Sequence, residues 1–379
     1  MSPAAFAVGQ RRALEQLLHR LQQLDPAARL YSYLDDSYLV VRAGLGALTL
    51  TGLREVLAPL GLELNDDKTL VWSPAGVQAV EAELASKCVP VLPVLGAQLR
   101  APGDADGAAL PLGGQGCGLD GATARLEKLW ANLERLLQGG LKRQAAGALL
   151  NTYAGNASQH NLQLALAGGE ETFRYDAALR GCWEKLLGRP LGPEACELLG
   201  LPAKLGGAGA QWAATRRAPA CWAAWTQAAE EVRDDLGVSG VSTLADMLAA
   251  LPQAAAALEA TRAELARQGA DPEPAAPLEA LLGHPTKQKP LVAMVHKRTH
   301  AAAKQRMHHC SQASLLSAGG PGAGAYLRYP TELACTLEDP HWQTANRSRA
   351  QLPQPECSTD ELARAATTCQ NLAAGGVPC

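Results

Sequence analysis

The stretch from Tyr31 to Val41 constrains the fold more than any other part of the chain. Aromatic and apolar residues lead up to two adjacent aspartates, Asp35 and Asp36, and β-forming residues follow them. This pattern predicts two short strands over residues 29–42, joined by a tight turn that carries both carboxylates. Because adjacent carboxylates repel each other, they remain charged at low cost only where they are exposed or paired with cations.

Two carboxylates at a hairpin tip suit a hard divalent cation. Mg²⁺ is commonly held by one or two carboxylates together with substrate phosphates, and Mn²⁺ accepts the same ligands. The tip is therefore a candidate metal and catalytic site for phosphoryl transfer, with Asp35 as the better candidate ligand and Asp36 as the supporting one. The alternative is a solvated Asp-Asp turn without chemistry.

The segments around and after this tip resemble the ordered blocks of a known family. Residues 33–36, Tyr-Leu-Asp-Asp, resemble the Tyr-x-Asp-Asp signature of reverse transcriptases, which has a hydrophobic strand on each side. Residues 60–69 resemble the family's next block, Gly-(Leu/Ile)-x-(Leu/Val)-Asn-x-x-Lys-(Thr/Ser), which precedes a strand, here expected at residues 70–72. Val94-Leu95-Gly96 resembles the primer-grip hairpin, and residues 2–7 resemble the end of the Gln-Gly block. The order of the blocks identifies the chain as similar to reverse transcriptases of non-LTR retroelements.

The resemblance implies an α+β fold that begins with part of a polymerase palm, an antiparallel sheet with helices, and continues as a helical thumb and a helical C-terminal region. The expected domains are the C-terminal half of the palm, a Gly-rich linker, a helical thumb-like region, a helical extension, a Pro-rich link with a basic helix, and a Cys-containing, poorly ordered tail. Their boundaries are 1–100, 101–120, 121–200, 201–269, 270–330 and 331–379, respectively.

The implied activity is RNA-directed DNA polymerisation by two-metal nucleotidyl transfer, with an RNA template, a DNA primer and deoxynucleotides as partners. By the resemblance, Lys68 lies near the phosphates of the incoming nucleotide and acts in catalysis, and Tyr33 contacts nucleic acid. A surface lysine that opens a strand is the alternative for Lys68.

Apolar residues at helical spacing predict helices over residues 1–28, 50–60, 141–167 and 170–187, and a further apolar stripe runs from Leu126 to Leu137. In the thumb-like region, Arg135, Lys142 and Arg143 are candidate contacts for the phosphate backbone of a bound duplex. A solvated helix face is the alternative for each of them.

Residues 280–331 contain no Asp or Glu but hold seven Lys or Arg and five His. This local excess of positive charge makes four residues candidate nucleic-acid contacts: Lys297, Arg298, Lys304 and Arg306. The alternative is a basic helix that pairs with the acidic helix carrying Glu230, Glu231, Asp234 and Asp235. His296 and His300 lie four residues apart, but the His-Glu-x-x-His pattern of zinc hydrolases is not present.

The composition and charge of the chain argue against several classes of protein. A formal net charge of −3 gives no global nucleic-acid signal, so any basic surface must be local. No apolar run approaches ~20 residues and no signal peptide is evident, so we expect no membrane partner. The ten cysteines lack paired spacing, and those of the tail are too far apart for a zinc finger. Reduced thiols in the nucleus or cytoplasm are therefore expected.

One block of the family is not found. Reverse transcriptases use a further aspartate, upstream of the Tyr-x-Asp-Asp block, to hold the two metals. The one Asp before the hairpin is Asp25, which lies too close to the hairpin and in another context. The sequence thus predicts an incomplete copy that is inactive alone. A non-catalytic nucleic-acid-binding remnant and a helical interaction protein are the alternatives.

Overall fold

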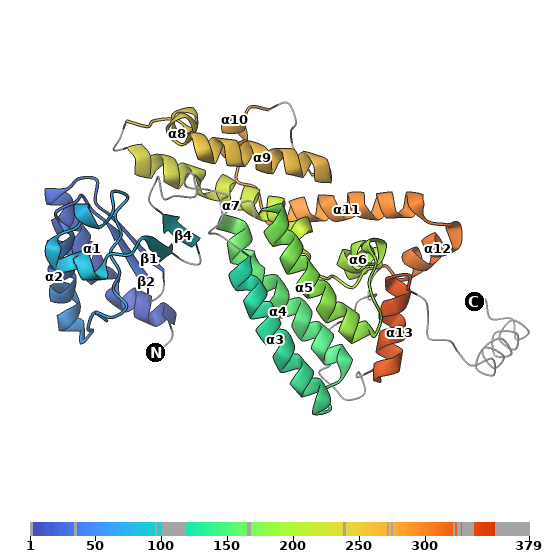
Figure 1. Ribbon diagram of the computed structural model, residues 1–379. Coiled ribbons are helices and arrows are strands. Elements are labelled where there is room, and N and C mark those ends of the chain that lie inside the picture. The colour runs from blue at the N-terminus through green and yellow to red at the C-terminus, as the bar shows by residue number, and fades with distance from the viewer. Residues whose placement is uncertain are drawn as a thin grey trace, which may run out of the picture.

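The computed structural model describes residues 3–33, 36–94, 97–100, 119–164, 168–237, 240–270, 273, 276–320, 323, 327 and 337–352. Figure 1 shows a small N-terminal unit of helices and strands at one end of a larger helical body. Most of the predicted Gly-rich linker, residues 101–118, lies outside the described residues.

The described residues of the N-terminal unit form two antiparallel hairpins, three short 3₁₀ helices and two α-helices. Its elements in chain order are α1 (Pro3–Leu24), β1 (Arg29–Tyr33), β2 (Asp36–Val40), α2 (Gly46–Leu57), η1 (Ala58–Leu60), η2 (Val77–Ala79), η3 (Ala82–Lys87), β3 (Val91–Val94) and β4 (Ala97–Arg100). Helix α2 begins four residues before the start expected from the sequence.

The first hairpin is confirmed. Its register pairs Arg29 with Val40 and Tyr33 with Asp36, so the connection consists of residues 34 and 35, which lie outside the described residues. The second hairpin pairs Val94 with Ala97 in the same way.

The strand predicted at residues 70–72 is wrong. Val71 forms only an isolated parallel bridge with Cys88. Proline follows within three residues on both segments, at Pro74 and Pro90, and a proline cannot donate a backbone hydrogen bond to a ladder. The pairing therefore stops after a single bridge.

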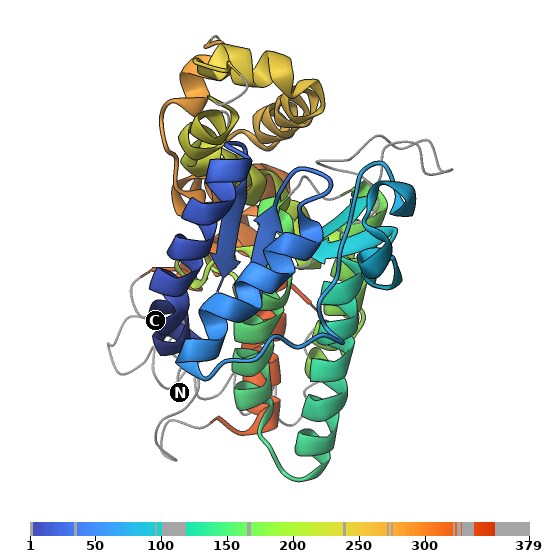
Figure 2. The same ribbon diagram turned by 90° about the vertical axis from the view of Figure 1, so that its left-hand side faces the viewer.

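Helix α1 packs its apolar side against α2 and one face of the first hairpin (Figure 2). The buried side chains of this small core include those of Leu14, Leu17, Leu21, Leu53 and Leu57, with Leu30 and Leu39 of the hairpin packed against them. These leucines follow the helical spacing predicted from the sequence.

Asp25 joins the end of α1 to the base of the first hairpin. Its buried carboxylate accepts hydrogen bonds from the backbone N–H groups of Ala27 at 3.1 Å and Arg42 at 2.7 Å. Asp25 thus has a structural role, and its hydrogen bonds give no indication that it binds a metal.

The helical body is built around α7, which contacts α4, α5, α8, α9, α10 and α11. The helices of the body are α3 (Asp120–Gln138), α4 (Arg143–Leu164), α5 (Gly169–Leu187), α6 (Pro193–Gly200), α7 (Ala213–Leu236), α8 (Leu244–Ala250), α9 (Pro252–Gln268), α10 (Leu278–Leu282), α11 (Gln288–Arg306), α12 (His309–Ser317) and α13 (Asp339–Arg349), with the 3₁₀ helix η4 (Ala203–Leu205) after α6. The helices predicted over 141–167 and 170–187 correspond to α4 and α5.

The prediction of a poorly ordered tail is wrong for residues 337–352, because α13 is part of the core. The side chain of Trp342 is 1% exposed and stacks on Trp183 with ring centroids 6.3 Å apart. Gly147 of α4 makes room for it, since a Cβ atom there would lie 2.6 Å from the Trp342 ring. The segment 270–330 also holds more helix than the link predicted, because α10 packs its leucines beneath α7 and α8.

Two side chains of the first hairpin join the N-terminal unit to the helical body. The Tyr31 hydroxyl donates a hydrogen bond to Asp235 at the end of α7 (2.7 Å), and Arg29 forms an ion pair with the same carboxylate (3.5 Å). The pKa of Tyr31 is raised to about 12 by burial and by the hydrogen bond to this carboxylate.

The described residues are mostly helical, with 70% in helices and 5% in strands. The small antiparallel sheets are compatible with the α+β class, but they do not show a polymerase palm. Among the described helices, none is both long and apolar enough to cross a membrane. The cysteines described by the structure as free thiols are Cys88, Cys182, Cys196 and Cys221.

Candidate functional site

The tip of the first hairpin places Asp36 at the surface. Asp36 begins β2, is exposed, and forms no ion pair or hydrogen bond with any described side chain. Asp35, its neighbour in the predicted catalytic pair, and the side chain of Tyr33 lie outside the described residues. The described part of the tip therefore offers one free carboxylate to a ligand.

The metal expected from the resemblance requires more ligands than this. In the described part of the chain, no three His, Cys, Asp or Glu side chains converge in a way that could hold a metal ion. Asp36 with its neighbour Asp35 supplies at most one side of a two-metal site. These residues alone do not fit a complete Mg²⁺ or Mn²⁺ centre.

Lys68 lies in a turn organised by Asn65. The Asn65 side-chain oxygen accepts hydrogen bonds from the backbone N–H groups of Asp67 (3.1 Å) and Lys68 (3.2 Å), and the Thr69 hydroxyl donates to the Asn65 carbonyl (2.8 Å). This explains Asn65 and Thr69 structurally. Lys68 itself is exposed, and it pairs with none of the described acids.

The basic residues of the thumb-like region are engaged within the protein. Lys142 forms an ion pair with Glu338 at 2.6 Å, and the backbone N–H of Arg143 donates to Asp339 at 2.9 Å. The Arg143 guanidinium also donates to the carbonyl oxygens of Lys185 and Leu186 at the end of α5.

These contacts give Lys142 and Arg143 a clear structural role, which is to hold the start of α13 against α4 and α5. Arg135 forms a hydrogen bond with Asn132 on its own helix.

The basic helix predicted from the acid-free span is α11, and its charges differ in environment. Lys297 and Arg298 are exposed and have no ion pair with a described acid, and the same is true of the half-buried Lys304. Arg306 instead pairs with Glu197 of α6. The side chain of Arg298 also covers Gly269 at the end of α9.

The acidic helix offered as an alternative partner for α11 is engaged elsewhere. Asp235 contacts the hairpin, while Glu230 and Asp234 both pair with Arg233 of their own helix. In the described structure α11 therefore keeps most of its positive charge unneutralised.

Three lysines of α11 form a row. Lys289, Lys297 and Lys304 follow one another at intervals of eight and seven residues. Since two turns of an α-helix take about seven residues, they lie along one side of the helix over roughly 22 Å. The sequence alone did not separate these three lysines from the other basic residues. The bounds of α11 are needed to tell which residues lie on the same side of the helix.

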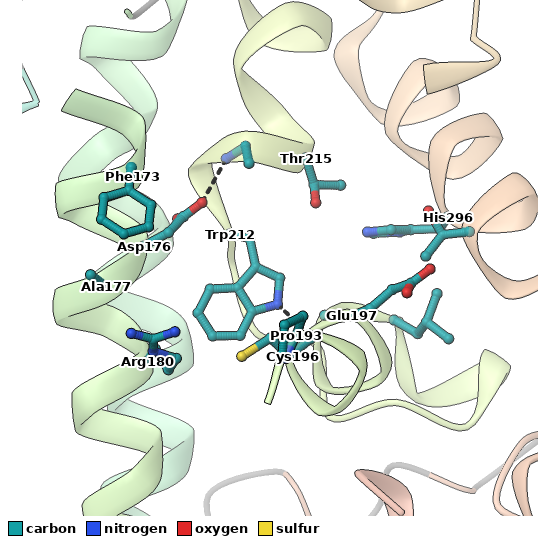
Figure 3. A pocket seen from close by; sticks show the side chains of 14 residues that line it. Phe173, Asp176, Ala177, Arg180, Pro193, Cys196, Glu197, Trp212, Thr215 and His296 are labelled. Carbon is teal, nitrogen blue, oxygen red and sulfur yellow. Dashed lines mark hydrogen bonds between the residues drawn. The ribbon is translucent and has the colours of Figure 1, made fainter. Parts of the chain in front are cut away.

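A cavity of about 450 Å³ lies between α5, α6, the start of α7 and α11 (Figure 3). The helices α5 and α6 each line it with four residues at helical spacing, and α7 and α11 close the other sides. Its walls are formed by Phe173, Asp176, Ala177, Arg180, Pro193, Cys196, Glu197, Gly200, Leu201, Trp212, Ala214, Thr215, His296 and Thr299.

Asp176 of α5 caps the first turn of α7. Its carboxylate accepts hydrogen bonds from the backbone N–H groups of Ala213 (2.7 Å) and Ala214 (3.0 Å). Burial raises the pKa of Asp176 to about 6, and the two backbone N–H groups oppose that shift. At neutral pH the Asp176 carboxylate therefore has a structural role, which is to cap the start of α7.

His296 is the one member of this cavity that the sequence had marked, as half of an i,i+4 pair with His300. Burial and the nearby charge of Lys204 lower the pKa of His296, which favours a neutral imidazole. The remaining lining residues follow no motif, because they come from four helices that are far apart in the sequence. In the sequence, these lining residues could be found only as helical stripes that mix polar and aromatic side chains.

Comparison of the chain with protein-family models, curated proteins and solved structures found no match. The resemblance to reverse transcriptases therefore rests on the sequence blocks alone, and the function follows as a proposal.

Proposed function

We propose that this chain is the C-terminal part of a retroelement RNA-directed DNA polymerase, in which the first hairpin carries two of the carboxylates used in nucleotidyl transfer. The observation that carries the proposal is the free, exposed carboxylate of Asp36 beside a connection of two residues, one of which is Asp35. A carboxylate without a cationic partner on the protein remains available for a cation brought with a substrate.

The order of the elements supports the proposal. The helix α1 supports the hairpin β1–β2, and α2, the Asn65–Lys68 turn and the hairpin β3–β4 follow in the order of the family's sequence blocks. The exposed Lys68 is free of described acids, as a phosphate-binding cation requires.

In the proposed reaction, the primer 3′ oxygen forms a bond to the α-phosphorus of a deoxynucleotide while the bond to the leaving pyrophosphate breaks. Such sites use two metal ions held by carboxylates from more than one side. Because the described residues supply only part of that ligand set, we expect no primer extension by this chain alone.

Primer extension on an RNA template tests this function. The 379-residue chain with Mg²⁺ should give no product, and fusion to the fingers and upstream palm segment of a reverse transcriptase should restore some. In the fusion, Asp35→Asn should abolish extension, because an amide cannot offset the charge of a metal. Asp67→Asn is the matched control, since Asp67 is an exposed aspartate in another turn. Robust extension by the chain alone, or an active Asp35→Asn fusion, would contradict the proposal.

A second candidate, nucleic-acid binding without catalysis, is favoured by the row of lysines on α11. Three cations on one side of a helix can follow a phosphate backbone, and described acids neutralise none of them. Fluorescence anisotropy with a labelled RNA–DNA duplex tests this binding. Replacing Lys289, Lys297 and Lys304 with Ala should weaken it and reduce the salt slope by about 3.

The control for that experiment replaces Arg12, Arg20 and Lys128, which removes the same charge from other exposed surfaces. A lysine variant that binds as the control does would show that α11 is not the contact.

A further inference from the structure

The cavity between α5, α6, α7 and α11 has the size and lining of a small-molecule site. Its volume of about 450 Å³ lies within the range of ligand pockets, which are mostly apolar with a few convergent polar groups. Its chemistry follows from which of its polar groups are already engaged within the protein.

The acceptor groups of the cavity are engaged. Asp176 accepts two backbone N–H groups of α7, and Glu197 pairs with Arg306. The Trp212 indole N–H donates to the Cys196 carbonyl at 2.8 Å. Because neither carboxylate is free, the cavity is a poor site for a cation.

The remaining polar groups of the cavity can all donate hydrogen bonds. Among the described residues, Arg180 forms an ion pair with Glu184, and the distance of 3.8 Å is too long for a hydrogen bond. The Glu184 carboxylate already accepts a hydrogen bond from the backbone N–H of Leu191 at 2.9 Å. The Arg180 guanidinium therefore donates no hydrogen bond to a described residue, and its forked N–H groups suit the oxygens of a phosphate.

Thr215, Thr299 and His296 complete the free set, since none of them forms a hydrogen bond with another described residue. In Figure 3 the Thr215 hydroxyl and the His296 ring point into the cavity. A neutral imidazole offers one donor and one acceptor, and each hydroxyl offers both. Such groups suit the hydroxyls of a sugar or the polar edge of a base.

Two aromatic rings provide surfaces for a planar ligand. The Trp212 indole lies in the middle of the cavity wall and is 8% exposed, whereas Phe173 at the rim is 67% exposed. The position of the indole depends on Gly200, where a Cβ atom would lie 2.4 Å from the Trp212 ring. Stacking on aromatic side chains is a common way to hold a nucleobase.

We propose that this cavity binds a nucleoside monophosphate unit, with the base against Trp212 and Phe173, the phosphate on Arg180, and the sugar or base edge on the threonines and His296. The unit is either a free nucleotide or the unstacked 5′-terminal nucleotide of a single strand. This binding requires no polymerase activity, so it stands or fails separately from the proposed function.

Isothermal titration of the full chain with adenosine 5′-monophosphate tests the proposal. The nucleotide should bind saturably and at least about tenfold more tightly than adenosine, because a charge-assisted hydrogen bond contributes that much. Arg180→Gln should remove this difference, and Arg180→Lys should retain part of it. Phe173→Ala should weaken the binding of both ligands by about fivefold or more.

Arg174→Gln is the matched control, since Arg174 is on the same helix but pairs with Asp120 outside the cavity. Tyr153→Ala is the control for loss of an exposed aromatic ring. Thermal unfolding of each variant verifies that it is folded before titration.

Competition identifies the source of the ligand. A 5′-phosphorylated oligodeoxyadenylate that displaces the nucleotide indicates a strand end, and displacement only by free nucleotides indicates a soluble ligand. Both results support the site. Absence of saturable binding at millimolar nucleotide, or unchanged binding in Arg180→Gln and Arg180→Lys alike, would overturn it.

Discussion

The N-terminal unit and the helical body differ in their sequence motifs and in the size of their buried cores. The N-terminal unit has recognisable sequence blocks but a small core of leucines beneath two-stranded sheets. The helical body has no catalytic motif but buries Trp183, Trp222, Trp342 and Tyr175 almost completely. The sequence blocks behind the proposed function therefore lie in the region with the smaller core. The largest buried side chains lie in the region where no such block is visible.

The two regions also differ in how their charged groups are used. At the hairpin tip, Asp36 is free of described partners, whereas Lys142 and Arg143 in the body are bound to α13. A charge on a helix surface is thus no guide to binding until its partners are known.

The largest effect is expected from Trp342→Ala, which should lower the free energy of unfolding by about 4 kcal/mol. The ring is almost fully buried against Trp183, and its removal leaves a cavity between α4, α5 and α13. Urea denaturation monitored by circular dichroism measures the loss. Tyr153→Ala, which removes an exposed ring, is the control. A loss below 1 kcal/mol would mean that α13 is not part of the core.

Leu17→Ala should cost about 3 kcal/mol in the N-terminal unit, because Leu17 is 1% exposed at the centre of the small core. The same denaturation experiment sharpens the comparison between the regions. If the two units unfold separately, Leu17→Ala shifts a different transition from Trp342→Ala. A single transition shifted by both variants would show instead that the chain unfolds as one unit.

The pKa of Asp176 predicts a pH dependence in the helical body. In the folded state its pKa is about 6, above the ordinary 3.8, so the folded protein keeps the proton in a window where the unfolded chain has lost it. The free energy of unfolding should therefore fall by about 2 kcal/mol as the pH rises from about 4 to 6. Asp176→Asn should flatten this part of the profile, and an unchanged slope would rule Asp176 out as its source.

Asp25→Ala should lower the free energy of unfolding of the N-terminal unit by about 2 kcal/mol, since the backbone N–H groups of Ala27 and Arg42 lose their acceptor. Asp67→Ala, which removes an exposed carboxylate, should change it little. Equal effects of the two substitutions would argue against a structural role for Asp25.

The smallest effect is expected from Asp235→Asn at the junction of the two regions, because exposed ion pairs contribute less than about 1 kcal/mol. Its sharper readout is the pKa of Tyr31, which should fall from about 12 when the negative charge is removed. Ultraviolet titration of tyrosinate absorbance, with Tyr31→Phe to identify the signal, measures this change. An unchanged pKa would show that the contact does not form in solution.

Local patterns predicted several elements well. The β-forming residues on both sides of Asp35 and Asp36 predicted the hairpin, and helical spacing predicted α4 and α5 within a few residues. The predicted strand at residues 70–72 was wrong, because prolines in two segments end the pairing. The predicted poorly ordered tail was wrong for residues 337–352, because Trp342 packs against Trp183 of a distant segment.

The sequence by itself determined the position of the first hairpin and the helical character of the body, since both follow from side-chain periods over fewer than about 20 residues. Only the tertiary structure decided which charges are free, where α13 packs and that four helices line a cavity. The contact between Lys142 and Glu338 spans 196 residues of the chain. Contacts of that kind depend on the angles at which helices cross. Those angles are set by side-chain packing between distant segments, which the local periodicity of the sequence does not reveal.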